Sequence, residues 1–259
     1  MTDVVQSAWA ALDLNWWQAL VTVAAILVGS SIAGLTGFGF ALVIVPVLLL
    51  LFPPPTVVAV TSSLGVASGL PILVQDRVHV RGRIIGPLLI PALAGQLIGV
   101  RMLISLDSRI IKLIAGVVVI TFALVVTRGR VIPGIGTRLA PVVAGLLSGV
   151  LGTSTGMAGP PIVLFLTDRA PEPRAFRASI TMYFVAVNSI GLVIVGQTGS
   201  IGKREFWLAA VLLPVALAGR RLGQTMLHRV DRNQFRRITL MLLIVTGASA
   251  MLTALLGLI

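Results

Sequence analysis

The chain has 259 residues, of which 57% are hydrophobic and only 11% are charged. Soluble globular domains carry roughly 45–50% apolar and about 25% charged residues. The polar side chains are therefore too few to cover a water-facing surface, which excludes a soluble enzyme and a disordered or fibrous protein. The composition predicts an all-α polytopic membrane protein embedded in a lipid bilayer.

The formal net charge of +12 comes from 20 Lys and Arg residues against 8 Asp and Glu residues. A protein that binds nucleic acid needs its basic residues on a water-exposed face. Here they form short clusters between apolar runs, as in loops that face a cytoplasmic leaflet, so no nucleic-acid partner is expected. The chain has no cysteine, which removes thiolate ligands and disulfides, and we expect no metal site and no cofactor.

Successive apolar runs predict the membrane helices, since a hydrocarbon core about 30 Å thick requires roughly 20 helical residues. Most runs are long enough to cross, but two of them, 139–152 and 157–167, resemble half-helices separated by a Gly-rich break. The first pair of runs has the same break with a longer first arm. Each broken pair either crosses twice or forms a re-entrant hairpin, and in both cases the chain returns to its starting side. The runs cover 16–34, 38–51, 56–74, 84–104, 110–127, 139–152, 157–167, 179–197, 206–227 and 238–258.

The basic residues divide unequally between the two sides that this order of runs defines. Thirteen of the 20 fall in the loops 75–83, 128–138, 168–177 and 228–237, and five fall on the side that also carries both termini. The excess of Lys and Arg in cytoplasmic loops then predicts cytoplasmic Arg-rich loops and external termini. The tryptophans near the N-terminus fit an interfacial anchor on the external side: Trp9, Trp16 and Trp17.

The two halves of the chain resemble each other. Residues 33–37 align with 148–152 at an offset of 115, and a later ordered series that includes Gly95 and Gly219 aligns at an offset of 124. Each half contains one broken or re-entrant helix pair and three transmembrane helices, so the second half starts on the opposite side of the membrane. This pattern predicts two inverted-topology repeats, an arrangement found in secondary transporters. The predicted divisions are a first membrane repeat with an external N-terminal tail at 1–127, a cytoplasmic linker at 128–138 and a second membrane repeat at 139–259.

The Gly-rich breaks at 34–39 and 149–159 are the first candidate site. Irregular backbone at membrane depth is tolerated where it is buried in protein or lines a wet cavity. The N-termini of half-helices then present free N–H groups and a positive dipole end, which suit an anion. One such patch alone favours close helix packing through small residues, whereas two at corresponding positions favour binding. The predicted binding residues in the breaks are Thr36, Gly37, Phe38, Gly39, Thr153, Ser154, Thr155 and Gly156.

Polar residues inside the other spans extend this candidate set to Ser62, Ser63, Gln96, Asn188 and Arg220. A cation at membrane depth is costly and is by default a functional hypothesis, although Arg220 could also extend its charge to the cytoplasmic interface. Gln96 occupies the position of Arg220 in the other repeat. Ser62 and Asn188 could equally form ordinary hydrogen bonds between helices.

The acidic residues all fall outside the predicted spans. A cation transporter or proton pump usually keeps a carboxylate within the bilayer, so an anionic substrate is favoured. The two histidines, His79 and His228, also fall in loops, and an intramembrane hydrolase would need such groups at membrane depth, so we expect no enzyme. The acidic residues are Asp3, Asp13, Asp76, Asp107, Asp168, Glu172, Glu205 and Asp231.

Four segments carry a resemblance to a known family. They are GLTGFGFALVIVP at 34–46, AVTSS at 59–63, Gly-Pro-Pro at 159–161, and Arg-Ala-Ser at 177–179 with Asn188 further along. With them, roughly 20–257 resembles the sulfite exporter TauE/SafE family of bacterial membrane permeases. The resemblance implies a multi-pass carrier of the bacterial plasma (inner) membrane that moves sulfur-containing anions, often outward. It also implies binding positions around residues 36–39, Ser62, residues 153–156 and Asn188.

These observations together predict a secondary transporter that exports a small sulfur-containing oxyanion, such as sulfite or an organosulfonate, by alternating access. The alternatives are an anion channel, a permease for another small organic or inorganic anion, and an enzyme acting on a lipid-linked substrate. Trans-stimulation by unlabelled substrate would distinguish a carrier from a channel. The direction, the coupling ion and the assembly of identical copies into a homo-oligomer stay open.

Overall fold

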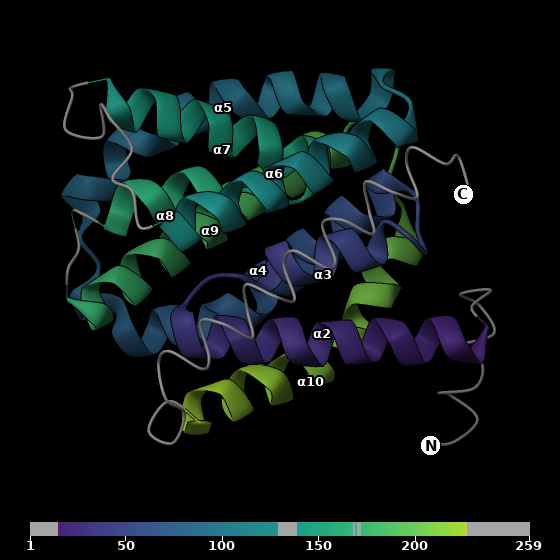
Figure 1. Ribbon diagram of the computed structural model, residues 1–259, viewed down its shortest axis with the longest axis horizontal. Helices are drawn as coiled ribbons and strands as arrows, with labels where there is room; N and C mark the ends of the chain where they lie inside the picture. The colour runs from purple at the N-terminus through teal and green to yellow at the C-terminus, as the bar shows by residue number, and fades with distance from the viewer. Residues whose placement is uncertain (1–14, 129–138, 168, 170–171, 227–259) are drawn as a thin grey trace.

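The computed structural model describes residues 15–128, 139–167, 169 and 172–226, and these residues form helices without a strand (Figure 1). Six of the described helical segments are long and apolar enough to cross a membrane. The all-α polytopic membrane fold is therefore confirmed. The helices are α2 (Trp16–Thr36), α3 (Phe40–Leu48), α4 (Pro54–Asp76), the 3-10 turn η1 (Arg77–His79), α5 (Gly82–Ser105), α6 (Ser108–Arg128), α7 (Ala140–Thr155), α8 (Gly159–Thr167), α9 (Pro173–Gly196) and α10 (Lys203–Met226).

Several predictions concern segments outside the described residues: the N-terminal tail with Trp9, the linker from 129 onward, the loop 228–237 and the span 238–258. They stay predictions, as do the three proposed divisions of the chain.

The described connections gather at two opposite ends of the bundle. At one end Asp76, the last residue of α4, pairs with Arg177 in the first turns of α9, with Nε 3.7 Å from Oδ2. At the other end the Thr56 hydroxyl, near the start of α4, donates to Glu205 at the start of α10 at 3.1 Å. We call the end with Asp76 and Arg177 the Arg-rich end, and the end with Thr56 and Glu205 the opposite end. The side of the membrane that each one faces stays a prediction.

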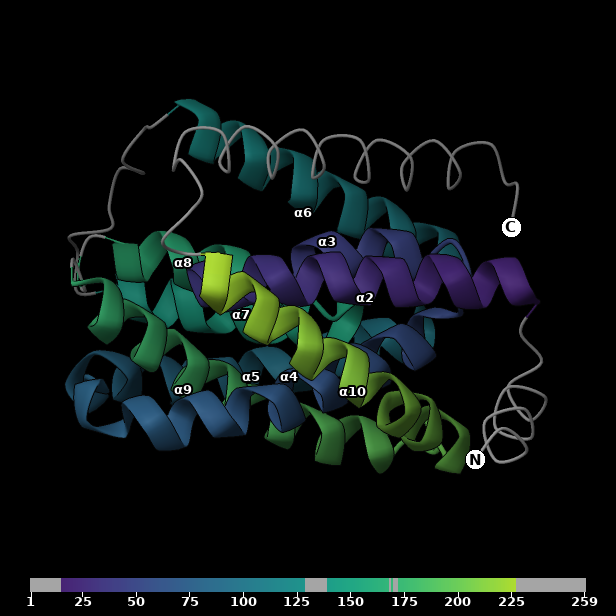
Figure 2. The same ribbon diagram turned by 90° about the horizontal axis from the view of Figure 1, so that it is seen from below.

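Close contacts through glycine fix the two largest helix interfaces, α5 with α7 and α2 with α10 (Figures 1 and 2). A Cβ on Gly149 of α7 would overlap the carbonyl oxygen of Ala92 in α5, and a Cβ on Gly223 of α10 would overlap that of Ser31 in α2. Residue numbers rise together along both interfaces, so each pair is parallel. The two interfaces correspond if α2 and α5 are the counterparts of α7 and α10, as the repeat predicts.

The central pair α4 and α9 crosses the bundle in opposite directions. A Cβ on Gly65 would lie 2.9 Å from Nδ2 of Asn188, and one on Gly69 would lie 2.9 Å from Cγ2 of Val185, so numbers rise along one helix as they fall along the other. Because α10 and α4 start at the same end of the bundle, these two helices run in the same direction. The helix α2 is parallel to α10 and therefore shares that direction. The helices α4 and α9, which the predicted repeat treats as counterparts, thus run in opposite directions. Their relation to a membrane plane stays a prediction.

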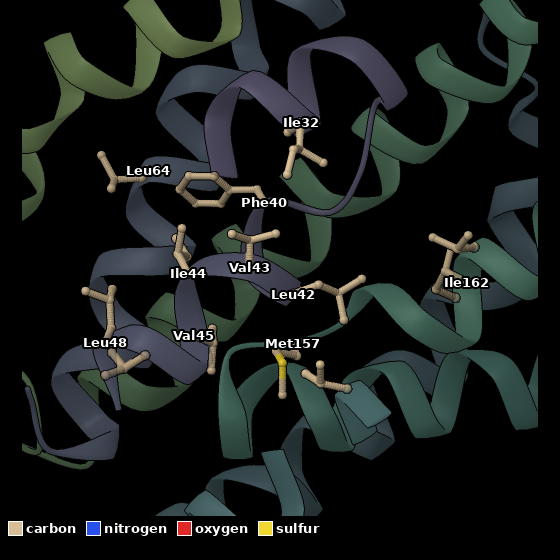
Figure 3. Close-up of a cluster of buried hydrophobic side chains, with 14 of the residues drawn as sticks. Ile32, Phe40, Leu42, Val43, Ile44, Val45, Leu48, Leu64, Met157 and Ile162 are labelled. Carbon is tan, nitrogen blue, oxygen red and sulfur yellow. The ribbon is translucent and has the colours of Figure 1, made fainter. Parts of the chain in front are cut away.

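The short helix α3 lies inside the protein. Seven of its nine residues are buried, among them Phe40, Ile44 and Leu48. Figure 3 shows the side chains of this helix in one apolar cluster that also contains Leu64 from α4 and Met157 from the second break. The N-terminus of a half-helix is thus held in the apolar centre of the bundle, where its backbone dipole is poorly screened by water.

Candidate functional site

Two broken helix pairs form the frame of the site. The first helix of each pair ends on a glycine in the left-handed region, with φ of 82° at Gly37 and 84° at Gly156, and Gly39 adopts a φ of 92°. An L-residue with a Cβ pays a steric cost in that region, so these glycines allow the sharp breaks. The breaks therefore occur where the glycine pattern predicts them.

A cavity of about 50 Å³ lies between the two breaks. One water requires roughly 10–15 Å³ of such space, so the cavity is large enough for a few waters or a compact oxyanion. The breaks, α4, α9 and α10 all contribute to its wall. The lining residues are Ala33, Gly37, Phe38, Gly39, Phe40, Ala41, Leu42, Thr61, Gly65, Gly156, Ala158, Gly159, Thr181, Phe184, Asn188 and Arg220.

The first turn of α3 offers backbone donors to this cavity. Phe40, Ala41 and Leu42 line it, and the first hydrogen bond within the helix comes only from the N–H of Val43 to the carbonyl of Gly39, at 3.2 Å. The three preceding N–H groups have no acceptor within their own helix. The start of α8 differs, because its second and third residues are prolines without an N–H. The anion-suited helix end is therefore that of the first break.

Arg220 supplies the positive charge of the site, and it is the single charged residue among those that line the cavity. Arg220 belongs to α10. Only 9% of the residue is exposed, and its Nε has no hydrogen-bond partner. The backbone around it is fixed by close packing, since a Cβ on Gly34 would overlap the carbonyl oxygen of Arg220. A buried donor without an acceptor is costly, and an anion in the cavity would satisfy it.

Several predicted hydroxyl donors already donate to backbone carbonyls. The Thr153 hydroxyl lies 3.0 Å from the carbonyl oxygen of Gln96, and those of Ser154 and Thr155 donate to the carbonyls one turn back at 2.6 and 2.8 Å. The Thr36 hydroxyl lies 2.6 Å from the carbonyl oxygen of Phe38 across the first break. None of these four side chains lines the cavity. The observed contacts instead stabilise the breaks and the contact between helices.

The other predicted site residues divide in the same way. Gln96 is buried and donates from Nε2 to the carbonyl oxygen of Val187 at 2.6 Å, bridging α5 to α9 away from the cavity. Ser62 is buried, and Ser63 has a buried hydroxyl without a partner, yet neither lines the cavity. The predicted residues that the structure brings together around the cavity are Gly37, Phe38, Gly39, Gly156, Asn188 and Arg220.

Sequence reasoning missed Thr61, Gly65, Thr181 and Phe184, which also line the cavity. Thr61 and Gly65 are four residues apart, and Thr181, Phe184 and Asn188 follow at spacings of three and four, so each set lies on one helix face. This spacing of three and four residues is the sequence signal that indicates which helix face lines the cavity. Polarity alone favours Ser62 and Ser63, the neighbours of Thr61, because composition does not give the rotation of a helix about its axis.

The described acidic residues lie at helix ends. Asp107 and Glu172 flank α6 and α9, as predicted for loops, whereas Asp76 and Glu205 lie within the terminal turns of α4 and α10. None of these four lines the cavity. Among the described residues no group of histidine and acidic side chains could hold a metal ion.

The fold and the cavity define a class of protein, a multi-pass helical membrane protein whose broken helices enclose a small, positively charged pocket. Residues 21–250 match the family described as Sulfite exporter TauE/SafE, and the chain belongs to this family of membrane transporters. The family predicted from the four sequence segments is thus confirmed, and family membership supports a transporter rather than an enzyme.

Two relatives are similar over much of their length. A protein named "Probable sulfite/organosulfonate exporter TauE" from Cupriavidus necator is 26% identical over 235 residues, which cover 87% of this chain and 91% of the relative. A protein named "Probable inner membrane transporter protein TsaS" from Comamonas testosteroni is 29% identical over 179 residues, which cover 66% and 72%. No solved structure matches the chain significantly.

Proposed function

We propose that the protein exports small sulfur-containing oxyanions, such as sulfite or an organosulfonate, across the bacterial inner membrane by alternating access. The names of the two relatives support this class of substrate, and the cavity suits an anion. In this proposal the Arg-rich end faces the cytoplasm, where the positive-inside rule places clustered arginines.

The observation that carries the proposal is the buried, incompletely hydrogen-bonded guanidinium of Arg220 in a cavity without an acidic lining residue. A cationic substrate would meet an uncompensated like charge there. An oxyanion would accept charge-assisted hydrogen bonds from the guanidinium, and such bonds contribute roughly 1.5–3 kcal/mol each.

In this proposal the other hydrogen-bond donors of the cavity orient the bound anion. The free N–H groups at the start of α3 approach it from the first half of the chain, and the Asn188 amide approaches it from α9. The cavity volume of about 50 Å³ admits an oxyanion of the size of sulfite in the described conformation. A longer organosulfonate requires the cavity to widen, as rocking of one repeat against the other would allow.

Counterflow of radiolabelled sulfite in proteoliposomes tests this function, because trans-stimulation by unlabelled sulfite occurs in a carrier and not in a channel. We expect trans-stimulation in the wild type and its loss in Arg220→Gln, together with a rise in the Kd for sulfite of roughly 10- to 100-fold. The matched control is Arg221→Gln, which removes an equal charge from the exposed neighbouring side chain and should leave both values unchanged. Flux without trans-stimulation would indicate a channel, and equal effects of the two variants would contradict the assigned site.

A second pair of variants separates the cavity from the breaks. Asn188→Ala should weaken sulfite binding with little change in thermal stability, because the amide lines the cavity. Thr153→Val should lower stability with little change in the Kd, because its hydroxyl contacts the carbonyls of Gln96 and Gly149. The reverse pattern would place the anion at the second break.

A further inference from the structure

The start of α9 contacts the first break through two adjacent side chains. A Cβ on Gly37 would lie 3.1 Å from Cγ of Arg177, so this arginine covers the left-handed glycine. The Phe176 ring packs edge-on against Phe38, with ring centroids 6.1 Å apart. Gly37 and Phe38 both line the cavity, so Arg177 lies at the boundary between the cavity and the Arg-rich end.

Arg177 is paired only loosely in the structure. Its Nε is 3.7 Å from Oδ2 of Asp76, which is beyond hydrogen-bond length, and this buried Nε has no hydrogen-bond partner. The two side chains are 20% and 25% exposed, so water screens their attraction only in part. The carboxylate therefore balances the charge of Arg177 while leaving a donor free for a second acceptor.

Arg177 also lies within electrostatic reach of Arg220, and the two positive charges repel each other. A small anion close to either guanidinium would reduce that repulsion. The cavity lining contains Arg220 but not Arg177, so the second guanidinium stands outside the pocket, on the side of the Arg-rich end.

We infer that Arg177 is a second anion-binding residue, at the Arg-rich entrance to the cavity, and that Asp76 is its internal counter-ion, which an incoming sulfite or sulfonate displaces. The inference rests on the proposed function and adds a residue pair outside the cavity to it. The anion accepts hydrogen bonds from Arg177, replaces Asp76 as its counter-ion and then passes to Arg220.

Competition with Asp76 lowers the apparent affinity of the wild type for sulfite. The apparent Kd equals the intrinsic value divided by the fraction of molecules in which Arg177 is free of its partner. Asp76→Asn removes the internal competitor, and for a partly shielded ion pair we expect the Kd of purified full-length protein for sulfite to fall by about fivefold. Isothermal titration measures this value.

A double-mutant cycle tests whether the effect passes through Arg177. Arg177→Gln alone should raise the Kd for sulfite, and Asp76→Asn should have no further effect in that background. A long-range effect of the Asp76 charge would persist in the double variant and would contradict the inference. The matched control is Glu172→Gln, which removes a carboxylate paired with Arg81 at 3.6 Å at the same end, where both side chains are more than half exposed. We expect no change in its Kd.

The results separate this inference from the proposed function. If the wild type neither binds nor exchanges sulfite or a sulfonate, and Arg220→Gln changes nothing, the proposed function fails. If the wild type binds sulfite, Arg220→Gln weakens binding, and Asp76→Asn leaves the Kd unchanged, the function stands and the entrance site is wrong. Should Arg177→Gln fail to fold, the Kd of Asp76→Asn compared with that of Glu172→Gln still decides.

Discussion

Replacing Arg220 by methionine should make the empty protein more stable while removing its affinity for anions. Only 9% of the residue is exposed and its Nε lacks a hydrogen-bond acceptor, so burial of the guanidinium carries a desolvation cost. Exchanging a buried ion pair for apolar side chains of similar volume often stabilises proteins by about 1–4 kcal/mol, and the described residues that line the cavity include no acidic partner of Arg220 that the exchange would leave unpaired. The adjoining cavity of about 50 Å³ admits a few waters, which reduces the cost, and we therefore expect a gain of roughly 1–2 kcal/mol.

Thermal unfolding of the purified protein in detergent, with and without sulfite, measures both effects. A ligand at 100 times its Kd stabilises the folded state by about 2.7 kcal/mol, so the wild type should gain stability on adding sulfite. Arg220→Met should gain none, and the order of the two proteins should reverse between the empty and the saturated state. The backbone contact of Gly34 with residue 220 is unaffected by this change.

Arg221→Met is the control, since it removes a neighbouring charge from an exposed side chain. Its free energy of unfolding should lie within about 0.5 kcal/mol of the wild-type value, and sulfite should still stabilise it. A less stable empty Arg220→Met protein would refute the reasoning, because it would show that the guanidinium is already satisfied by the fold. A sulfite response retained in that variant would refute the binding role.

Two further predictions use glycines with matched controls. Gly99→Ala should destabilise the protein by about 1–3 kcal/mol in thermal unfolding, because its Cβ would overlap the Thr153 hydroxyl, whereas Gly86→Ala in the same helix meets nothing within 4 Å and should stabilise it by about 0.5–1 kcal/mol. Equal effects would contradict the packing of α5 on α7. Gly37→Ala and Gly199→Ala should each cost about 1–2 kcal/mol because both positions have positive φ, but only Gly37→Ala should slow sulfite counterflow, since Gly37 shapes the cavity. Slowed counterflow in both would indicate a general folding defect.

The positions of the helices and breaks could be predicted because each rests on a local property of the chain. Apolar length gives a span, and the glycines between Gly34 and Gly39 give a break, because residues with a Cβ adopt φ of 82° and 92° only at a steric cost. The face that a residue presents depends instead on how neighbouring helices rotate. For this reason Thr61 lines the cavity while the predicted Ser62 and Ser63 do not.

The alignment between the two halves of the sequence does not extend to side-chain chemistry. Gln96 and Arg220 align between the halves, but Gln96 donates to a backbone carbonyl in a helix contact while Arg220 faces the cavity. The threonine hydroxyl groups that the sequence predicts as anion donors show a similar difference. Thr153 and Thr155 lie in the last turn of α7, and each hydroxyl contacts the carbonyl oxygen four residues earlier, a local alternative that a threonine in a helix has.

The chemical asymmetry gives the anion a role in the proposed transport cycle. The first half contributes the free N–H groups of α3 and the counter-ion Asp76, whereas the second half contributes Arg177, Asn188 and Arg220. An anion bound between the α3 N-terminus and Arg220 therefore joins the two halves, and its binding energy favours whichever conformation brings them together. When the site is empty, no anion links the α3 N-terminus to Arg220, so the substrate itself would determine when the halves close around it.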